Sequence, residues 1–225
     1  DHPDVKVILD SIRILKKEFG NDVPIIGKTM GPWTLAYHVF GVETFLLGSV
    51  DSPDETIKSL EKLQEFTYLF GEAQVDAGAD VLTIPDHATG DLVSGQYYQK
   101  FLQEIHSEMA QKFTVPLILH ICGRTVDRMP YIADTGMHAF HFDSKNSPQE
   151  AMDAVDNKIA LVGNINNPET LYSKEAEDVK KEVFDCLNAG VQLIAPECAI
   201  PLKTKAENLV AINEGISDWL AETNS

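Results

Sequence analysis

Short apolar runs alternate with longer amphipathic segments along the chain, and three of the apolar runs share one design. Each begins with a glycine, continues as a short apolar stretch and ends in a carboxylate. They run from Gly78 to Asp86, from Gly136 to Asp143 and from Gly190 to Glu197. Glycine readily takes the left-handed conformation that ends a helix. The glycines recur at intervals of about 55 residues, which leaves room for two strand–helix units in each interval.

Three further apolar runs complete the series of predicted strands. They cover residues 24–27, 115–121 and 159–163. Uninterrupted apolar strands are typical of a parallel sheet whose two faces are both buried.

Helix-start signals lie between these runs. Ser52-Pro53-Asp54-Glu55 and Ser147-Pro148-Gln149-Glu150 each place a serine before a proline and an acid in the first turn. Asn167-Pro168 predicts another helix, with an expected buried side of Val179, Val183, Phe184 and Leu187. The last helix is expected to bury Leu209, Ile212, Ile216 and Leu220.

Six strand–helix units of similar length predict an α/β fold, a (β/α)₈ TIM barrel of which about six units are present. We expect residues 1–225 to form a single barrel domain that lacks an N-terminal portion, with two more units upstream of Asp1. An open, doubly wound sheet is the alternative, but no Gly-x-Gly-x-x-Gly loop follows any of the predicted strands.

Composition narrows the classes of function. The net charge of −17 argues against a nucleic-acid partner, because few cations are available to neutralise phosphates. The sequence shows neither a signal peptide nor an apolar run of the roughly 18 residues that a membrane helix needs, so no membrane association is expected. Three cysteines do not suggest a disulfide framework, and we expect a reducing, cytoplasmic location.

A metal site is predicted at the ends of two strands. His120 and Cys122 end one strand on the same side, and Cys198 follows the last strand. In a barrel these ends meet at one mouth, where the chemistry of this fold lies. One histidine and two cysteines suit a catalytic zinc ion with an open fourth position, which would lower the pKa of a substrate thiol.

Other strand-end residues are candidates for catalysis. Asp143 is a possible fourth ligand or a partner that orients His120, although a turn cap is the plainer interpretation. Asp86 and His87 are candidate acids or bases, with a solvated loop role as the alternative. Cys186 lies within a predicted helix and is expected to be structural.

Several motifs resemble the uroporphyrinogen decarboxylase superfamily. They are Gly31-Pro32-Trp33-Thr34-Leu35-Ala36, Leu119-His120-Ile121-Cys122-Gly123, Gly163-Asn164-Ile165-Asn166-Asn167-Pro168 and Ala195-Pro196-Glu197-Cys198 with Glu207-Asn208-Leu209. The set of His120, Cys122 and Cys198 is similar to the corrinoid:coenzyme M methyltransferases of methylotrophic methanogens and their bacterial relatives. The chain departs from that branch at Glu197, where a glycine is usual, and in residues 201–205, which lack a familiar proline.

The resemblance implies a TIM barrel, one zinc ion, and methylcobalamin carried by a corrinoid protein as methyl donor. The acceptor would be a small thiol such as coenzyme M, whose sulfonate needs a cation. Lys28 and Arg124 are the candidates for that contact, and Asn164 is assigned to the substrate as well.

Three other functions stay open at this point. One is a demethylase that moves a methyl group from a methylated or methoxylated substrate to cob(I)alamin. Another is uroporphyrinogen decarboxylase itself, which needs no metal. The last is a non-catalytic corrinoid-binding or assembly protein, which the metal-ligand pattern disfavours.

Overall fold

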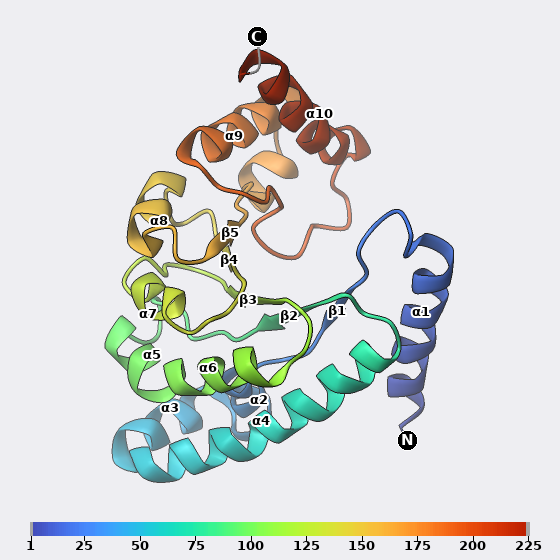
Figure 1. Cartoon of the computed structure of the whole chain (residues 1–225). Coiled ribbons are helices and arrows are strands. Elements are labelled where there is room, and N and C mark those ends of the chain that lie inside the picture. Colours follow the sequence, from blue (N-terminus) through green and yellow to red (C-terminus); the bar gives the residue numbers. More distant parts are fainter. Residues whose placement is uncertain (1, 224–225) are drawn as a thin grey trace. The chain divides into compact units, whose positions relative to one another are not determined.

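Five short parallel strands form the sheet of this chain, which a computed structural model describes for residues 2–223 (Figure 1). The strands are β1 (Ile26–Lys28), β2 (Val81–Pro85), β3 (Leu117–Ile121), β4 (Ala139–Phe142) and β5 (Ala160–Val162). Their order in the sheet is β1-β2-β3-β4-β5, so each strand pairs with its neighbour in sequence. This order is that of a (β/α)₈ barrel, and the predicted α/β class with a parallel sheet is confirmed.

Helices connect the strands and lie at both ends of the chain. They are α1 (Pro3–Phe19), α2 (Pro32–Phe40), α3 (Val42–Asp51), α4 (Pro53–Asp76), α5 (Gly95–Phe101), α6 (Gln103–Lys112), α7 (Met129–Ala133), α8 (Pro148–Val155), the π-helix η1 (Asn167–Leu171), α9 (Ala176–Ala189) and α10 (Ala206–Thr223). The predicted helix starts at Pro53 and Pro148 are confirmed. Among the described residues, none of these helices combines the length and the apolar character that crossing a bilayer requires.

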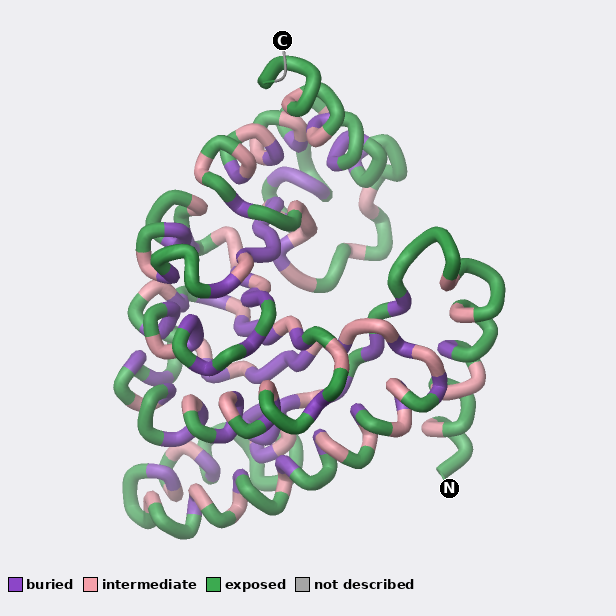
Figure 2. The backbone as a smooth tube through the Cα atoms, viewed as in Figure 1, coloured by how far each residue is buried: buried purple, intermediate pink, exposed green. Residues whose placement is uncertain are grey.

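The chain divides into two compact units, and the division crosses strand β3 between His120 and Ile121. Unit 1 comprises Asp1–Ala88, Tyr97–His120 and Thr135–His138, and unit 2 comprises Thr89–Gln96, Ile121–Asp134 and Ala139–Ser225. Burial follows the strands in both units, whereas the helices carry buried stripes on one side (Figure 2). The strands therefore supply the centre of each core.

Unit 1 packs helices against strands β1 and β2. Leu82 and Ile84 of β2 are fully buried. An aromatic cluster extends this core around Trp33 of α2, whose ring meets Phe45 edge-on with centroids 4.8 Å apart. The Gly-Pro-Trp-Thr stretch thus places a large buried side chain directly after the first strand.

Unit 2 packs α8, α9 and α10 around β4 and β5. Phe140 and Phe142 of β4 and Leu161 of β5 are fully buried. Helix α9 begins at Ala176, after the separate turn η1, so the helix predicted from Asn167 is in fact two elements. Its predicted buried residues Val179 and Val183 are confirmed.

Of the four residues predicted to be buried in the last helix, Ile212 is confirmed, Ile216 is half-buried, and Leu209 and Leu220 are wrong. Helix α10 buries Asn208, Ala211, Ile212 and Gly215, whereas Leu209 and Leu220 are 37% and 47% exposed. Gly215 explains the difference, because a side chain there would come within 3.2 Å of Val183 in α9. The buried face of α10 is therefore set by the close contact with α9 at a small residue and not by the spacing of apolar residues along α10.

The sixth predicted strand forms only isolated bridges, from Leu193 to Val162 and from Pro196 to Ile165. The interruption lies at Gly163, which has φ +134. A Cβ at this glycine would lie 2.8 Å from the carbonyl oxygen of Phe142. The backbone therefore leaves regular strand geometry at a position that only glycine accepts easily, and the pairing resumes two residues later.

We predict that Leu82→Ala lowers the free energy of unfolding by about 2–5 kcal/mol, because it leaves a cavity where the fully buried side chain of Leu82 lies. Leu69→Ala is the matched control, since Leu69 of α4 is 69% exposed. We expect the control to stay within about 0.5 kcal/mol of the original chain. Urea unfolding followed by circular dichroism measures both, and equal effects would contradict the described core.

Candidate metal centre

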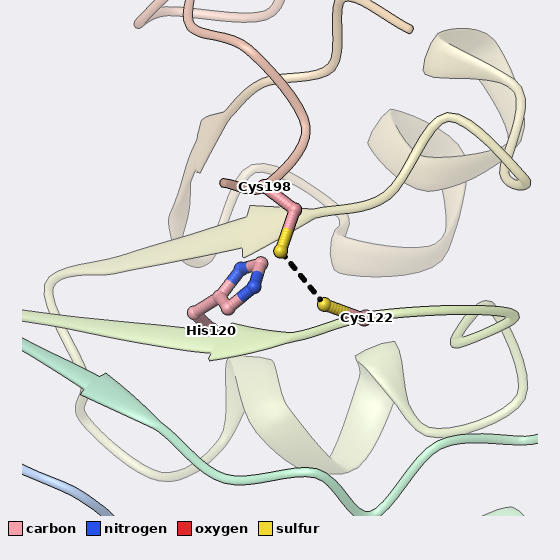
Figure 3. A group of neighbouring side chains, drawn as sticks. All are labelled: His120, Cys122 and Cys198. Atoms are coloured by element: carbon pink, nitrogen blue, oxygen red, sulfur yellow. Dashed lines mark hydrogen bonds between the residues drawn. The ribbon is translucent and has the colours of Figure 1, made fainter. Parts of the chain in front are cut away.

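His120, Cys122 and Cys198 form the one group of three potential ligands that converges within the described residues 2–223. One ligand atom from each side chain lies within 4.8 Å of the other two. His120 and Cys122 stand two residues apart at the end of β3, so the strand itself fixes their relation. The two sulfur atoms point toward each other beside the imidazole (Figure 3).

The donor set fits a zinc ion. The Sγ atoms of Cys122 and Cys198 are 3.3 Å apart. A tetrahedral zinc ion with Zn–S bonds of about 2.3 Å needs sulfur atoms about 3.8 Å apart, so a small opening of the pair is enough. The hydrogen bond with Cys198, together with burial, raises the pKa of Cys122 far above its usual value. A bound divalent cation would supply the positive charge that two neighbouring thiolates require.

Asp143 holds the turn that follows Cys122. Its Oδ2 accepts a hydrogen bond from the backbone N–H of Gly123 at 2.8 Å, and its Oδ1 accepts one from the backbone N–H of Lys145 at 2.9 Å. Gly123 has φ +80, and a Cβ there would lie 2.2 Å from the hydroxyl of Thr89. The carboxylate therefore closes a tight turn beside Cys122, as a turn cap does.

Two buried asparagines tie the loops around this turn together. Asn146 donates to the carbonyls of Gly123 and Asp143 and accepts from the backbone N–H of Thr125. Asn164 donates to the carbonyls of Asp143 and Asn146. The amide of Asn164, a predicted substrate contact, is thus engaged within the protein. Asn146 was missed in the sequence, where its only signal is its place three residues after a strand-end aspartate.

Asp86 lies in a buried network of unit 1. The carboxylate is fully buried, its Oδ1 accepts from the backbone N–H of Thr34 at 2.7 Å, and its Oδ2 is 3.0 Å from Nε2 of His106. The other ring nitrogen of His106 is 2.8 Å from the hydroxyl of Tyr98. This network was also missed, because Tyr98 and His106 lie on helices with no motif around them.

His87 follows Asp86, and its ring lies edge-on to that of His120. Its backbone N–H donates to the hydroxyl of Thr34 at 2.8 Å. Its ring centroid is 6.4 Å from that of His120, at an interplanar angle of 81°. Of the two predicted acid–base candidates, His87 is therefore half-buried near a ligand, whereas Asp86 is enclosed.

The two candidate cations have different surroundings. Arg124 is exposed, and its Nη1 is 3.0 Å from Oδ1 of Asp91. Lys145 reaches Oδ2 of the same carboxylate at 3.0 Å, and this lysine is the main cause of a lowered pKa of Asp91. Lys28 lies at the end of β1 in unit 1, where Gln74 binds both its backbone N–H and its carbonyl.

Cys186 stands apart from the other two cysteines. It is buried in α9, and its thiol donates to Oδ1 of Asn164 at 3.3 Å. Burial raises the pKa of Cys186 to about 11, so the thiol is protonated and unreactive near neutral pH.

The amino-acid sequence of this chain is similar to those of known enzymes. The chain is 32% identical over 219 residues to the methylcobamide:CoM methyltransferase MtaA of Methanosarcina barkeri, and the match covers 96% of this chain and 65% of that enzyme. It is 30% identical over 198 residues to a uroporphyrinogen decarboxylase of Mannheimia succiniciproducens, covering 82% of this chain and 54% of that enzyme.

A solved methyltransferase from Methanosarcina mazei superposes with a TM-score of 0.91 at 30% identity. The match covers 96% of this chain and 64% of that structure, so the chain spans just under two thirds of the length of these two relatives. The family model described as uroporphyrinogen decarboxylase (URO-D) matches residues 1–219. The chain with this His-Cys-Cys centre therefore belongs to the uroporphyrinogen decarboxylase (URO-D) family.

Proposed function

We propose that this chain is the zinc-binding part of a methyltransferase that moves a methyl group from a methylated corrinoid to a small thiol such as coenzyme M. The observation that carries the proposal is the convergence of His120, Cys122 and Cys198. The similarity to a methylcobamide:CoM methyltransferase over 96% of the chain supports it. A corrinoid protein is the proposed source of the methyl group, and a reducing compartment is the proposed setting.

Zinc bound by these three side chains would supply an open position that holds a substrate thiol as its thiolate. The chain's own residues have separate tasks. His120, Cys122 and Cys198 hold the ion, and Asp143 fixes the turn that carries Cys122. The thiolate sulfur would be the nucleophile toward the methyl group that a methylated corrinoid would supply, and the corrinoid would keep the electron pair of the bond to that methyl group.

His87 is proposed to take the proton that the substrate thiol loses and to pass it on to the solvent. Its ring lies beside His120, and its backbone is bound to the hydroxyl of Thr34. Asp86 contributes indirectly, because its buried carboxylate fixes the neighbouring backbone of Thr34. A proton acceptor beside the ligand set lets a thiol bind as thiolate near neutral pH.

Arg124 and Lys145 are the proposed contacts for an anionic group on the thiol substrate. Both cations share the single carboxylate of Asp91, so together the three side chains carry a net positive charge. Arg124 follows Cys122 by two residues, and Lys145 follows Asp143 by two. A sulfonate would find two cations close in sequence to two residues of the proposed site. Lys28 and Asn164 are weaker proposals for this contact. Lys28 is distant in sequence from the three proposed metal ligands, and the amide of Asn164 is already hydrogen-bonded within the protein.

A demethylase working in the opposite direction is the main rival. The same ligand set would then activate a leaving group, with cob(I)alamin as methyl acceptor. Uroporphyrinogen decarboxylase is a further rival, because family members with that activity are 30% identical to this chain. Neither rival requires a thiol to lose its proton on binding.

We predict that the protein binds about one zinc ion and that Cys198→Ser lowers zinc affinity more than about 100-fold. Partners that only orient a metal ligand are already worth about 10–100-fold, so loss of a ligand costs more. Chelator competition measures the affinity, and atomic absorption measures the stoichiometry. Unchanged affinity in Cys198→Ser would remove this cysteine from the site.

We predict that Cys186→Ala retains full zinc affinity and methyl transfer. The substitution removes a buried thiol that packs as a small hydrophobic group, so we expect it to cost about 1 kcal/mol of stability. Thermal unfolding and chelator competition on the same sample check both parts. Loss of zinc with the fold intact would show that Cys186 has a role at the metal.

We predict that binding of coenzyme M releases about one proton per thiol near pH 7. A free thiol with a pKa of roughly 8.5 or above is mostly protonated there, whereas the bound form is the thiolate. Calorimetry in buffers of different ionisation enthalpy measures the release. Absence of proton release, together with methyl transfer only from a methylated substrate to cob(I)alamin, would favour the demethylase.

A further inference from the structure

The segment that carries Cys198 is not part of a regular strand. It pairs with the stretch that follows β5 through the bridge between Pro196 and Ile165. Two backbone hydrogen bonds accompany the bridge, from Ile165 to the carbonyl of Ala195 and from Glu197 to the carbonyl of Ile165. Side chains also fix the segment around the next residue, Cys198.

Glu197 is the centre of that fixation. It is only 7% exposed, and its two oxygens face two different loops. Oε2 accepts from the backbone N–H of Ser144 at 2.9 Å, in the loop after β4. Oε1 accepts from the backbone N–H of Asn167 at 3.0 Å, at the start of η1. One carboxylate therefore joins the Cys198 segment to the two loops that surround it.

Side chains also hold the residues on either side of Glu197 and Cys198. Nε2 of His141 lies 2.8 Å from the carbonyl oxygen of Pro196, which can only accept, so this nitrogen carries the proton. Nδ2 of Asn167 donates to the carbonyl of Ala199 at 2.9 Å. Residues 196, 197 and 199 are thus all hydrogen-bonded to β4 or to neighbouring loops. Cys198 lies among them, with its sulfur 3.3 Å from that of Cys122.

The carboxylate is difficult to replace at this position. Hydrogen bonds to an ionised acceptor are about twice as strong as those between neutral groups. Glutamine retains one oxygen but places an NH₂ group opposite the second backbone N–H, and that N–H would lose its acceptor. A buried donor without an acceptor costs about 1–3 kcal/mol, which the segment would relieve by moving.

We propose that Glu197 is the positioning residue of the metal centre: by binding Ser144 and Asn167, it holds Cys198 where its sulfur meets Cys122 before any metal binds. Glu197 does not itself ligate the ion, because both its oxygens are engaged with backbone N–H groups. The proposal deepens the zinc site proposed above and rests on it only for the identity of the metal.

Zinc affinity of the full chain tests the proposal. Glu197→Gln should weaken zinc binding about 10–100-fold, the range typical of groups that orient metal ligands. The charge-transfer absorption of the cobalt-substituted protein should change as well, because it reports the sulfur ligands directly. Glu197→Asp, which keeps the charge but shortens the side chain, should fall between Gln and the original residue and serves if Glu197→Gln does not fold.

Glu182→Gln is the matched control. Glu182 also accepts a backbone N–H in unit 2, from Asn166 at 2.8 Å, and it accepts the hydroxyl of Thr170. It fixes the η1 turn, and neither of these two partners belongs to residues 195–199. We expect Glu182→Gln to lower thermal stability but to leave zinc affinity and the cobalt spectrum unchanged.

A metal-free readout separates this proposal from the proposed function. Phenylarsine oxide bridges two neighbouring thiols, with loss of water, and in a Cys186→Ala background only Cys122 and Cys198 remain. Glu197→Gln should weaken arsenical binding, and Glu182→Gln should not. If the chain binds no zinc but arsenical binding depends on Glu197, the zinc proposal fails and the positioning role stands. Original zinc and arsenical affinities in Glu197→Gln would overturn the positioning role.

Discussion

This structure depends on one kind of hydrogen bond. In it, a carboxylate at or near the end of a predicted strand accepts backbone N–H groups from neighbouring segments. Loops at strand ends carry donors that no strand satisfies, and burying such a donor without an acceptor is costly. Asp86 accepts from Thr34, Asp143 from Gly123 and Lys145, and Glu197 from Ser144 and Asn167. The repeated acidic residue of the sequence pattern is therefore first a structural device, and it operates in each of the two compact units.

The proposed metal ligands depend on the same device. His120 has the regular geometry of β3, whereas Cys122 begins a turn and Cys198 lies in an irregular segment. Asp143, which follows β4, holds Gly123 next to Cys122, and Glu197 binds two loops next to Cys198. Two sulfur atoms far apart in the sequence thus come within 3.3 Å of each other. Such organisation in advance of binding reduces the cost of ordering ligands around an ion.

Much of the fold could be predicted because continuous apolar runs in a repeating order leave few alternatives to a parallel sheet. Five of the six predicted strands lie within three residues of their expected limits, and the helix starts at Pro53 and Pro148 are confirmed. The predictions failed where two elements meet. Gly215 lets α10 approach α9 closely, which rotates the buried face, and Gly163 interrupts pairing with the last run. Neither contact is visible in the spacing of residues within one element.

The sequence by itself determined which side chains are candidate metal ligands, the place of His120 and Cys122 at the end of one strand, and the alternation that puts these two on one side, because these properties are local. It left open whether Asp86, Asp143 and Glu197 act in chemistry or as caps. Only the tertiary structure decided their surroundings, since a carboxylate's hydrogen-bond partners come from loops distant in sequence. The enclosure of Asp86 by Thr34 and His106, and the hold of Glu197 on two loops beside Cys198, are contacts that exist only after the chain has folded.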